Sequence, residues 1–139
     1  MNNYNIYKKK ISELSILLVD DSQCMHEISR HILEDLGAKD ITTAYSGNDA
    51  WKIINKLQLQ DKIFDLIISD WSMSDGSGIE LLKKIRSTDL YKNIPFFMLT
   101  AEIVDDSVNI AQREGVSEYI TKPFSQDTIV TIIKKYFEL

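Results

Sequence analysis

The sequence predicts an α/β protein: a doubly wound (βα)5 fold with a parallel five-stranded sheet. Two observations predict this class. Five short apolar runs alternate with segments of helical period along the chain. The runs are apolar at nearly every position, which is typical of strands that are buried on both faces. Right-handed crossovers then place the intervening helices on both sides of the sheet.

Length and composition limit the function classes. A chain of 139 residues corresponds to one domain and can bury a sizeable core without a disulfide or metal. The formal net charge of −5 argues against a nucleic-acid partner, because neutralising phosphates requires an excess of Lys and Arg. The single Cys24 and the lack of a run of about 20 apolar residues predict a cytoplasmic protein without disulfides or membrane insertion.

The expected strands are the apolar runs themselves. They cover residues 15–19, 41–45, 63–69, 94–100 and 117–121. Residues 1–14 are expected to be a polar lead-in that is frayed or forms a short extra turn, and residues 15–139 form the single domain.

Each run is followed by a segment with a helical apolar stripe. Four stripes consist of Met25, Ile28, Ile32 and Leu36; Ala50, Ile53, Ile54 and Leu57; Ile79, Leu82 and Ile85; and Ile129, Ile132, Ile133 and Tyr136. The fourth segment, residues 105–114, is more polar and stops at Gly115, as the first stops at Gly37. Ser77 and Glu80 have the spacing of a capping box at a helix start.

Polar residues occur where the expected strands end. Asp20 and Asp21 follow the first strand, Asp70 the third and Lys122 the fifth, while Thr100 closes the fourth. Ligands of open α/β sheets bind at the carboxyl ends of the strands, so these side chains are expected to converge. Clustered carboxylates require a cation, and Mg²⁺ prefers oxygen ligands, while a hydroxyl and an ammonium suit phosphoryl oxygens. The pattern predicts metal-assisted phosphoryl transfer to a carboxylate.

The sequence resembles a response-regulator receiver domain of two-component signalling, and its pattern is nearest to the single-domain chemotaxis regulators. The strings that carry the resemblance are ILLVDDS (16–22), LIISDWSMSDGSGIELLKKIR (66–86), PFFMLTAE (95–102) and GVSEYITKPF (115–124). The resemblance extends over residues 15–139 and implies the flavodoxin-like strand order 2-1-3-4-5.

The resemblance also implies roles for individual residues. Asp70 matches the phosphoacceptor, which takes a phosphoryl group from a sensor histidine kinase or phosphotransfer protein. Asp21 matches the direct Mg²⁺ ligand, and Asp20 the carboxylate that acts through a water molecule. The Ser72 backbone carbonyl matches a further metal ligand, and Asp70 is itself expected to bind Mg²⁺ together with Asp20 and Asp21. Lys122 matches the residue that pairs with the phosphoryl group, and its bond to Pro123 is usually cis in the family.

A conformational switch and an output surface follow from the same resemblance. Thr100 and Tyr119 match the switch pair, in which Thr100 turns toward the phosphoryl oxygen and the Tyr119 ring follows. The surface formed by the fourth helix, fifth strand and fifth helix is expected to control a protein partner from a monomer or weak dimer. Ser72 and Glu102 match positions that tune self-dephosphorylation, which predicts a phosphoryl lifetime of seconds to minutes.

The chain departs from the family after the phosphoacceptor. The usual Met-Pro-x-Met-x-Gly is replaced by residues 73–78, with Ser74 at the Pro position and Gly76 at the second Met. Because both changes increase backbone freedom, a looser loop is expected beside Asp75. Asp105 and Asp106 are expected to make the output surface more negative.

Alternatives remain at this point. A small Mg²⁺-dependent phosphohydrolase with an Asp nucleophile is the main one, although acids of that type are separated by one residue and Asp20 and Asp21 are adjacent. An interaction domain that is not phosphorylated is another. His26 and His31 are interpreted as exposed helix residues rather than phosphorelay histidines, and Cys24 as structural. Trp71 is either a reporter of the site or a loop aromatic.

Overall fold

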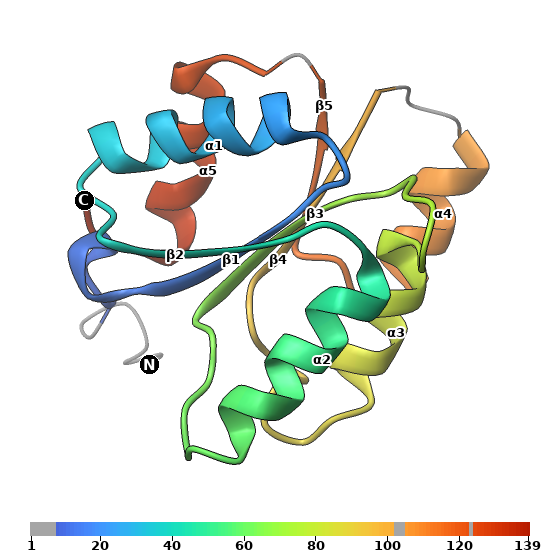
Figure 1. The fold of residues 1–139 in the computed structure, drawn as a ribbon. Coiled ribbons are helices and arrows are strands. Elements are labelled where there is room, and N and C mark those ends of the chain that lie inside the picture. Colours follow the sequence, from blue (N-terminus) through green and yellow to red (C-terminus); the bar gives the residue numbers. More distant parts are fainter. Residues whose placement is uncertain (1–7, 102–104, 123) are drawn as a thin grey trace, which may run out of the picture.

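The chain forms a five-stranded parallel sheet with strand order β2-β1-β3-β4-β5 (Figure 1). The computed structural model describes residues 8–101, 105–122 and 124–139. The strands are β1 (Ser15–Val19), β2 (Asp40–Ala44), β3 (Leu66–Asp70), β4 (Phe96–Thr100) and β5 (Glu118–Thr121). The predicted fold class and strand order are confirmed. The second predicted strand is shifted by one residue, and the third, fourth and fifth begin later than predicted.

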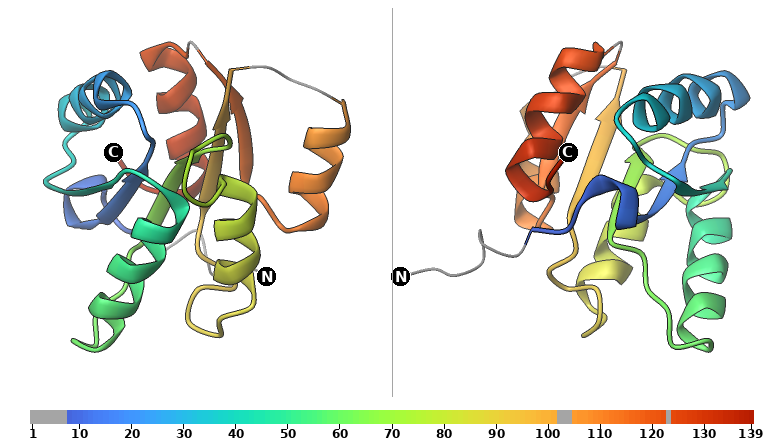
Figure 2. Two further views of the ribbon diagram at one scale, coloured as in Figure 1. Left: turned by 45° about the vertical axis from the view of Figure 1, so that its right-hand side comes forward. Right: turned by 90° about the vertical axis from the view of Figure 1, so that its left-hand side faces the viewer.

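Helices cover both faces of the sheet (Figure 2). They are α1 (Gln23–Asp35), α2 (Gly47–Gln58), α3 (Gly78–Arg86), α4 (Asp105–Arg113) and α5 (Gln126–Tyr136). α1 and α5 lie on one face, and α2, α3 and α4 lie on the other. Among the helices of the described ranges, none is long and apolar enough to cross a membrane.

Serine side chains fix the start of four helices. In each, the serine oxygen accepts a hydrogen bond from the backbone N–H three residues later, which satisfies one free donor of the first turn. These N-cap residues are Ser22, Ser46, Ser77 and Ser125. The predicted cap at Ser77 is therefore confirmed. Ser22 and Ser77 also determine where the loops after β1 and β3 end, and those loops carry the acidic residues.

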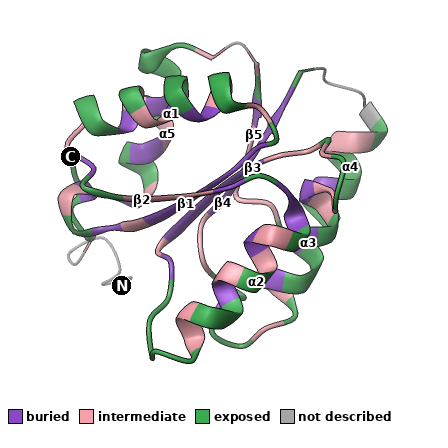
Figure 3. Cartoon of the chain, in the orientation of Figure 1, coloured by how far each residue is buried: buried purple, intermediate pink, exposed green. Residues whose placement is uncertain are grey.

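The central strands are buried along most of their length (Figure 3). Two apolar cores form, one on each face of the sheet. Ile16 and Leu18 face the core beneath α1 and α5, whereas Leu17 and Val19 face the core beneath α2 and α3. This alternation follows from the two-residue period of a strand. It explains why β1 is apolar at every position after Ser15.

The predicted apolar stripe of the first helix is wrong in part. The buried residues of α1 are His26, Ser29 and Leu33, whereas Ile28 is 45% exposed. Leu33 supplies the apolar contact to the core, and the first two turns turn polar side chains inward. Ile32 and Leu36 of the predicted stripe do pack against this core, so the prediction fails only in the first turns, where a histidine and a serine are buried.

The end of the expected lead-in contributes to the core. A short 3-10 helix spans Ile11–Glu13, and the side chains of Ile11 and Leu14 are buried. The Ile11 N–H donates to the Glu138 carbonyl at 2.8 Å, so this segment is paired with the C-terminal end.

Candidate functional site

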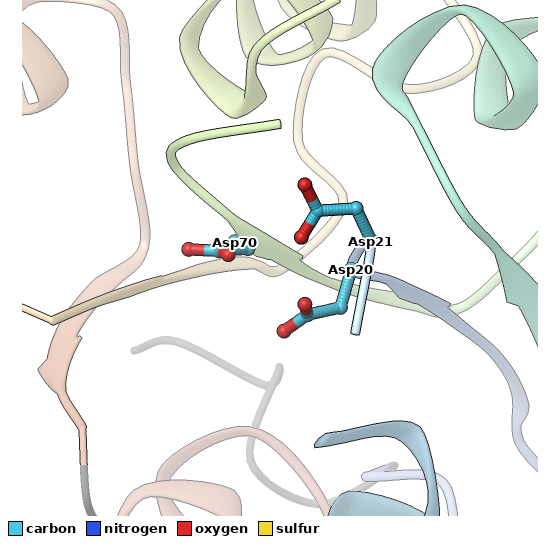
Figure 4. A group of neighbouring side chains, drawn as sticks. All are labelled: Asp20, Asp21 and Asp70. Atoms are coloured by element: carbon cyan, nitrogen blue, oxygen red, sulfur yellow. The ribbon is translucent and has the colours of Figure 1, made fainter. Parts of the chain in front are cut away.

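The three predicted acids meet at the carboxyl edge of the sheet (Figure 4). Asp20 and Asp21 follow β1, and Asp70 is the last residue of the adjacent strand β3. One carboxylate oxygen from each lies within 4.8 Å of the others. The chain thus places three oxygen ligands around one point, as expected from parallel strands ending at one edge.

Asp20 is 5% exposed, and each of its polar groups has a hydrogen-bond partner. Its N–H donates to the Ala44 carbonyl. Its Oδ1 accepts a 2.9 Å hydrogen bond from the Ser22 N–H, and its Oδ2 lies 2.9 Å from Lys122 Nζ. Its carbonyl oxygen lies 2.7 Å from His26 Nε2. This carboxylate is therefore rigidly oriented before any ligand binds.

Asp21 contrasts with its neighbour. It is exposed, and within the described ranges no hydrogen bond or ion pair involves its side chain. Its position follows from the backbone of the β1–α1 loop alone. An unpaired carboxylate at the rim of the cluster is free to coordinate an incoming cation.

Lys122 bridges two of the acids. Its Nζ lies 2.9 Å from Asp20 Oδ2 and 3.2 Å from Asp70 Oδ2. The Lys122 backbone N–H donates to the Thr100 carbonyl at 2.7 Å, which ties the end of β5 to the end of β4. Burial raises the pKa of Asp70, Lys122 opposes this shift, and Asp20 adds to it. Additional positive charge at this site would favour the ionised form of Asp70.

A cavity of about 340 Å³ opens beside Asp70. A water molecule occupies about 30 Å³ of liquid, so a phosphoryl group and several waters fit here. The predicted residues Ser72, Thr100 and Lys122 lie on its wall. The remaining lining residues are Trp71, Ala101 and Ser107. The structure thus brings together the predicted acids, the hydroxyl and the ammonium.

Tyr119 lies on β5 and contacts Trp71, the residue that follows Asp70. The Tyr119 and Trp71 rings meet edge to face, with centroids 6.2 Å apart. Among the described residues, no partner exists for the Tyr119 hydroxyl, although this atom is buried. The ring is therefore positioned by packing and not by a hydrogen bond. Sequence reasoning did not anticipate the contact between these two rings.

The loop after Asp70 is docked against α2, which corrects the expectation of a loose loop. The Gly47 and Asn48 N–H groups donate to the Gly76 and Asp75 carbonyls at 2.9 and 3.1 Å. Asn48 Nδ2 also donates to Asp75 Oδ1 at 2.8 Å. Gly76 has φ +88°, and a Cβ at this position would lie 2.9 Å from the Asn48 nitrogen. The glycine permits close docking here, and the docking restrains the loop.

Three of the predicted residues fall partly or wholly outside the part of the chain that the structure describes. Glu102 and Pro123 lie outside the described residues, as does the side chain of Asp105. His31 is exposed as predicted, but His26 is 3% exposed, so its interpretation as an exposed helix residue is wrong. Apolar periodicity carries no signal for that buried face, because two of its three residues, His26 and Ser29, are polar.

Comparison with known proteins assigns the family. The sequence model of the response regulator receiver domain matches residues 16–134. The chain belongs to this family. Its relatives place it more narrowly, among receiver domains of the CheY type.

Two curated relatives and one solved structure illustrate the similarity. Chemotaxis protein CheY-3 of Vibrio cholerae is 36% identical over 125 residues, 90% of this chain and 92% of the relative. Chemotaxis protein CheY of Pseudomonas aeruginosa is 34% identical over 125 residues, 90% of this chain and 97% of the relative. The crystal structure of Vibrio cholerae CheY4 has a TM-score of 0.77 and 30% identity, and the match covers 89% of this chain and 98% of that chain.

The residues at the site fit Mg²⁺, which receiver domains typically use. Three carboxylates from two adjacent strand ends supply the hard oxygen ligands that this ion prefers. Asp20 and Asp70 share one ammonium, while Asp21 has no cationic neighbour in the described ranges. A divalent cation would relieve the remaining repulsion between these acids.

Proposed function

We propose that this protein is a phosphoacceptor response regulator that takes a phosphoryl group onto Asp70 with Mg²⁺. The group would come from a phosphohistidine of a sensor kinase or phosphotransfer protein. The carrying observation is the position of Asp70, with Lys122 3.2 Å away and a cavity on its open side. The names of the chemotaxis relatives support a role in chemotaxis signalling.

The transfer is a displacement at phosphorus. An oxygen of the ionised Asp70 carboxylate forms a bond to phosphorus while the nitrogen–phosphorus bond of the phosphohistidine breaks. The released imidazole nitrogen retains the electron pair and takes a proton from solvent. The product on this chain is an acyl phosphate. Mg²⁺, when bound, supplies positive charge to the phosphoryl oxygens.

Two residues of this chain would hold the transferred group. Lys122 already lies beside the Asp70 carboxylate. After the transfer it can pair with a phosphoryl oxygen, because the phosphoryl group, like the carboxylate, is anionic. Thr100 lines the same cavity and can donate a hydroxyl hydrogen bond. Asp20 and Asp21 would hold the metal, and Asp20 is the more rigidly oriented of the two.

Loss of the phosphoryl group would return the switch to its resting state. Attack of water on phosphorus breaks the bond to the Asp70 oxygen, regenerates the carboxylate and releases inorganic phosphate. Ser72 is exposed on the cavity wall, which leaves a path for water. We expect a phosphoryl lifetime of seconds to minutes.

A downstream protein partner would bind the surface formed by α4, β5 and α5. An open groove of about 790 Å³ lies between α4 and β5. Its lining includes the switch residue Tyr119 and the acidic Glu118. The exposed Asp106 adds negative charge to α4, so a partner carrying Lys or Arg suits this surface. Such a partner, if it prefers the phosphorylated arrangement, must in turn favour phosphorylation.

Intact mass spectrometry tests the nucleophile. The wild-type protein, treated with a small phosphoryl donor and Mg²⁺, should gain the mass of one phosphoryl group, and Asp70→Asn should gain none. Full modification of Asp70→Asn would overturn the assignment. Rapid multiple turnover of phosphate esters by the wild type would instead indicate a phosphohydrolase.

Thr100→Ala tests the switch separately. This variant should still be modified at Asp70 but should lose most of the phosphorylation-dependent gain in partner affinity. A pull-down that compares the modified and unmodified forms measures this gain. Retention of the full gain would show that coupling to the output surface bypasses Thr100.

A further inference from the structure

We propose that His26 is a positioning residue for the metal site, because its imidazole fixes the peptide bond that joins Asp20 to Asp21. This inference rests on the proposed function in one respect: it takes Asp21 as a direct ligand of Mg²⁺. His26 would thus contribute to Mg²⁺ binding, and it would act neither as a phosphorelay histidine nor only as a core residue.

The hydrogen bond of His26 has a defined direction. Its Nε2 lies 2.7 Å from the Asp20 carbonyl oxygen, which can only accept a hydrogen bond. Nε2 therefore carries a proton and donates it to this bond. The His26 N–H donates to the Ser22 carbonyl at 3.2 Å, the usual bond of a first helical turn, so His26 is fixed on α1 while its ring reaches back to Asp20.

Packing alone does not account for a histidine at this position. The residue is 3% exposed, and its Nδ1 is buried without a partner in the part of the chain that the structure describes. A buried polar atom that lacks a partner is destabilising, so an apolar side chain would fill this space at lower cost. The benefit that offsets this cost is the bond to Asp20.

Tyr45 packs against the ring of His26. Its ring packs edge to face on the His26 ring, with centroids 4.7 Å apart and an interplanar angle of 68°. The Tyr45 hydroxyl donates to Gln23 Oε1 at 2.6 Å, which fastens the ring over the first turn of α1. A hydrogen bond that water cannot reach restrains the loop more effectively than an exposed one.

The orientation of the joining peptide is important because of Asp21. The Asp20 side chain has its own partners in Ser22 and Lys122, and it keeps its place through them. Asp21 has no side-chain partner among the described residues, so only the backbone orients its carboxylate. Rotation of the Asp20–Asp21 peptide would move that carboxylate away from the cluster. Mg²⁺ requires near-octahedral geometry and tolerates such displacement poorly.

The test compares three substitutions of His26 by their Mg²⁺ affinity. His26→Gln places an amide N–H near the position of Nε2, whereas the shorter His26→Asn cannot reach the Asp20 carbonyl, and His26→Leu has no donor. Groups that orient a metal ligand typically change affinity by about 10–100-fold. We expect Leu and Asn to raise the Mg²⁺ dissociation constant roughly tenfold, and Gln to retain most of the wild-type affinity.

The measurement uses Trp71, which lines the cavity, as a fluorescent reporter in a Trp51→Phe background. Ser29→Ala is the matched control, because Ser29 is also buried on α1 but lies one turn further from Asp20. Each variant is first checked by urea unfolding, so that affinities are compared only between folded proteins. The Gln and Asn variants keep a polar side chain. If His26→Leu does not fold, the ratio of their Mg²⁺ dissociation constants tests the proposal.

Two results would overturn the proposal. The first is wild-type Mg²⁺ affinity in both His26→Leu and His26→Asn while Asp21→Asn binds weakly; this result removes His26 and leaves the metal assignment intact. The second is wild-type affinity in Asp21→Asn, which removes Asp21 as a ligand and with it the metal site of the proposed function. Nitrogen NMR provides a further check, because the His26 ring must show its proton on Nε2.

Discussion

The Asn48 side-chain amide donates a 2.8 Å hydrogen bond to the Asp75 carboxylate, and this bond joins two segments that are distant in sequence. Asn48 lies in the first turn of α2, and Asp75 lies in the loop that follows Asp70. A carboxylate is favoured at a helix N-terminus because of the free N–H groups and the helix dipole. The pair thus docks the loop that contains Ser74 and Gly76 against the start of α2.

Exchange of these two residues tests the pair. Asp75→Ala should lower the free energy of unfolding by about 1 kcal/mol, because the bond and the favourable charge are lost. The double variant Asn48→Asp/Asp75→Asn should recover most of this loss, since the amide and the carboxylate change places. Urea denaturation measures both. If the loss of unfolding free energy in the double variant equalled the sum of the losses in Asn48→Asp and Asp75→Asn, the pair would not hold the loop.

Lys122 and a metal ion should compete for the same carboxylates. Lys122→Met should therefore bind Mg²⁺ several-fold more tightly in the absence of phosphoryl donor. It should also lower the free energy of unfolding by about 2 kcal/mol, between the values for exposed and buried ion pairs. Lys135→Met removes the same charge from the exposed pair with Glu118 and serves as the control. Equal changes in both variants would point to net charge and not to competition.

Asp70 should make the stability of the metal-free protein depend on pH. Burial is the largest cause that raises the pKa of Asp70, so the folded state binds this proton more tightly than the unfolded state, whose pKa is about 3.9. The ionised carboxylate is therefore destabilising at neutral pH, and this penalty disappears as the pH falls through the raised pKa toward about 3.9. Asp70→Asn should be more stable than the wild type at pH near 7.

The measurement is urea unfolding in the presence of a chelator over a series of pH values. The stability difference between Asp70→Asn and the wild type should shrink as the medium becomes more acidic. If instead the wild type were more stable than Asp70→Asn near pH 7 and lost this advantage on acidification, the Asp70 carboxylate would be net stabilised in the fold, with Lys122 outweighing burial.

The Tyr119 hydroxyl should be dispensable for stability. Because this buried oxygen lacks a partner among the described residues, Tyr119→Phe should raise the free energy of unfolding by about 1 kcal/mol. Tyr91→Phe is the matched opposite case, since the Tyr91 oxygen accepts a 3.0 Å hydrogen bond from the Phe64 N–H. That variant should be destabilised by about 1 kcal/mol or more. Destabilisation of Tyr119→Phe to the same extent would reveal a partner for its hydroxyl.

The sequence by itself determined the fold class and the composition of the acidic site. Continuous apolar runs are needed where strands are buried on both faces, and the chain has five of them in alternation with helices. Because parallel strands end at the same edge, acids after the first and third runs had to converge. The sequence therefore predicts a site composed of Asp20, Asp21, Asp70, Thr100 and Lys122.

The tertiary structure decided what each of these residues contacts. The apolar stripe predicts the inward face of α1 only in part, because His26 is held inward by a backbone carbonyl, an interaction that hydrophobic periodicity does not detect. Ser74 and Gly76 predict a loose loop after Asp70, because they increase local backbone freedom, whereas the docking partner Asn48 lies more than twenty residues earlier in the chain. Hydrogen bonds between distant segments depend on packing geometry, and local sequence pattern carries no direct information about that geometry.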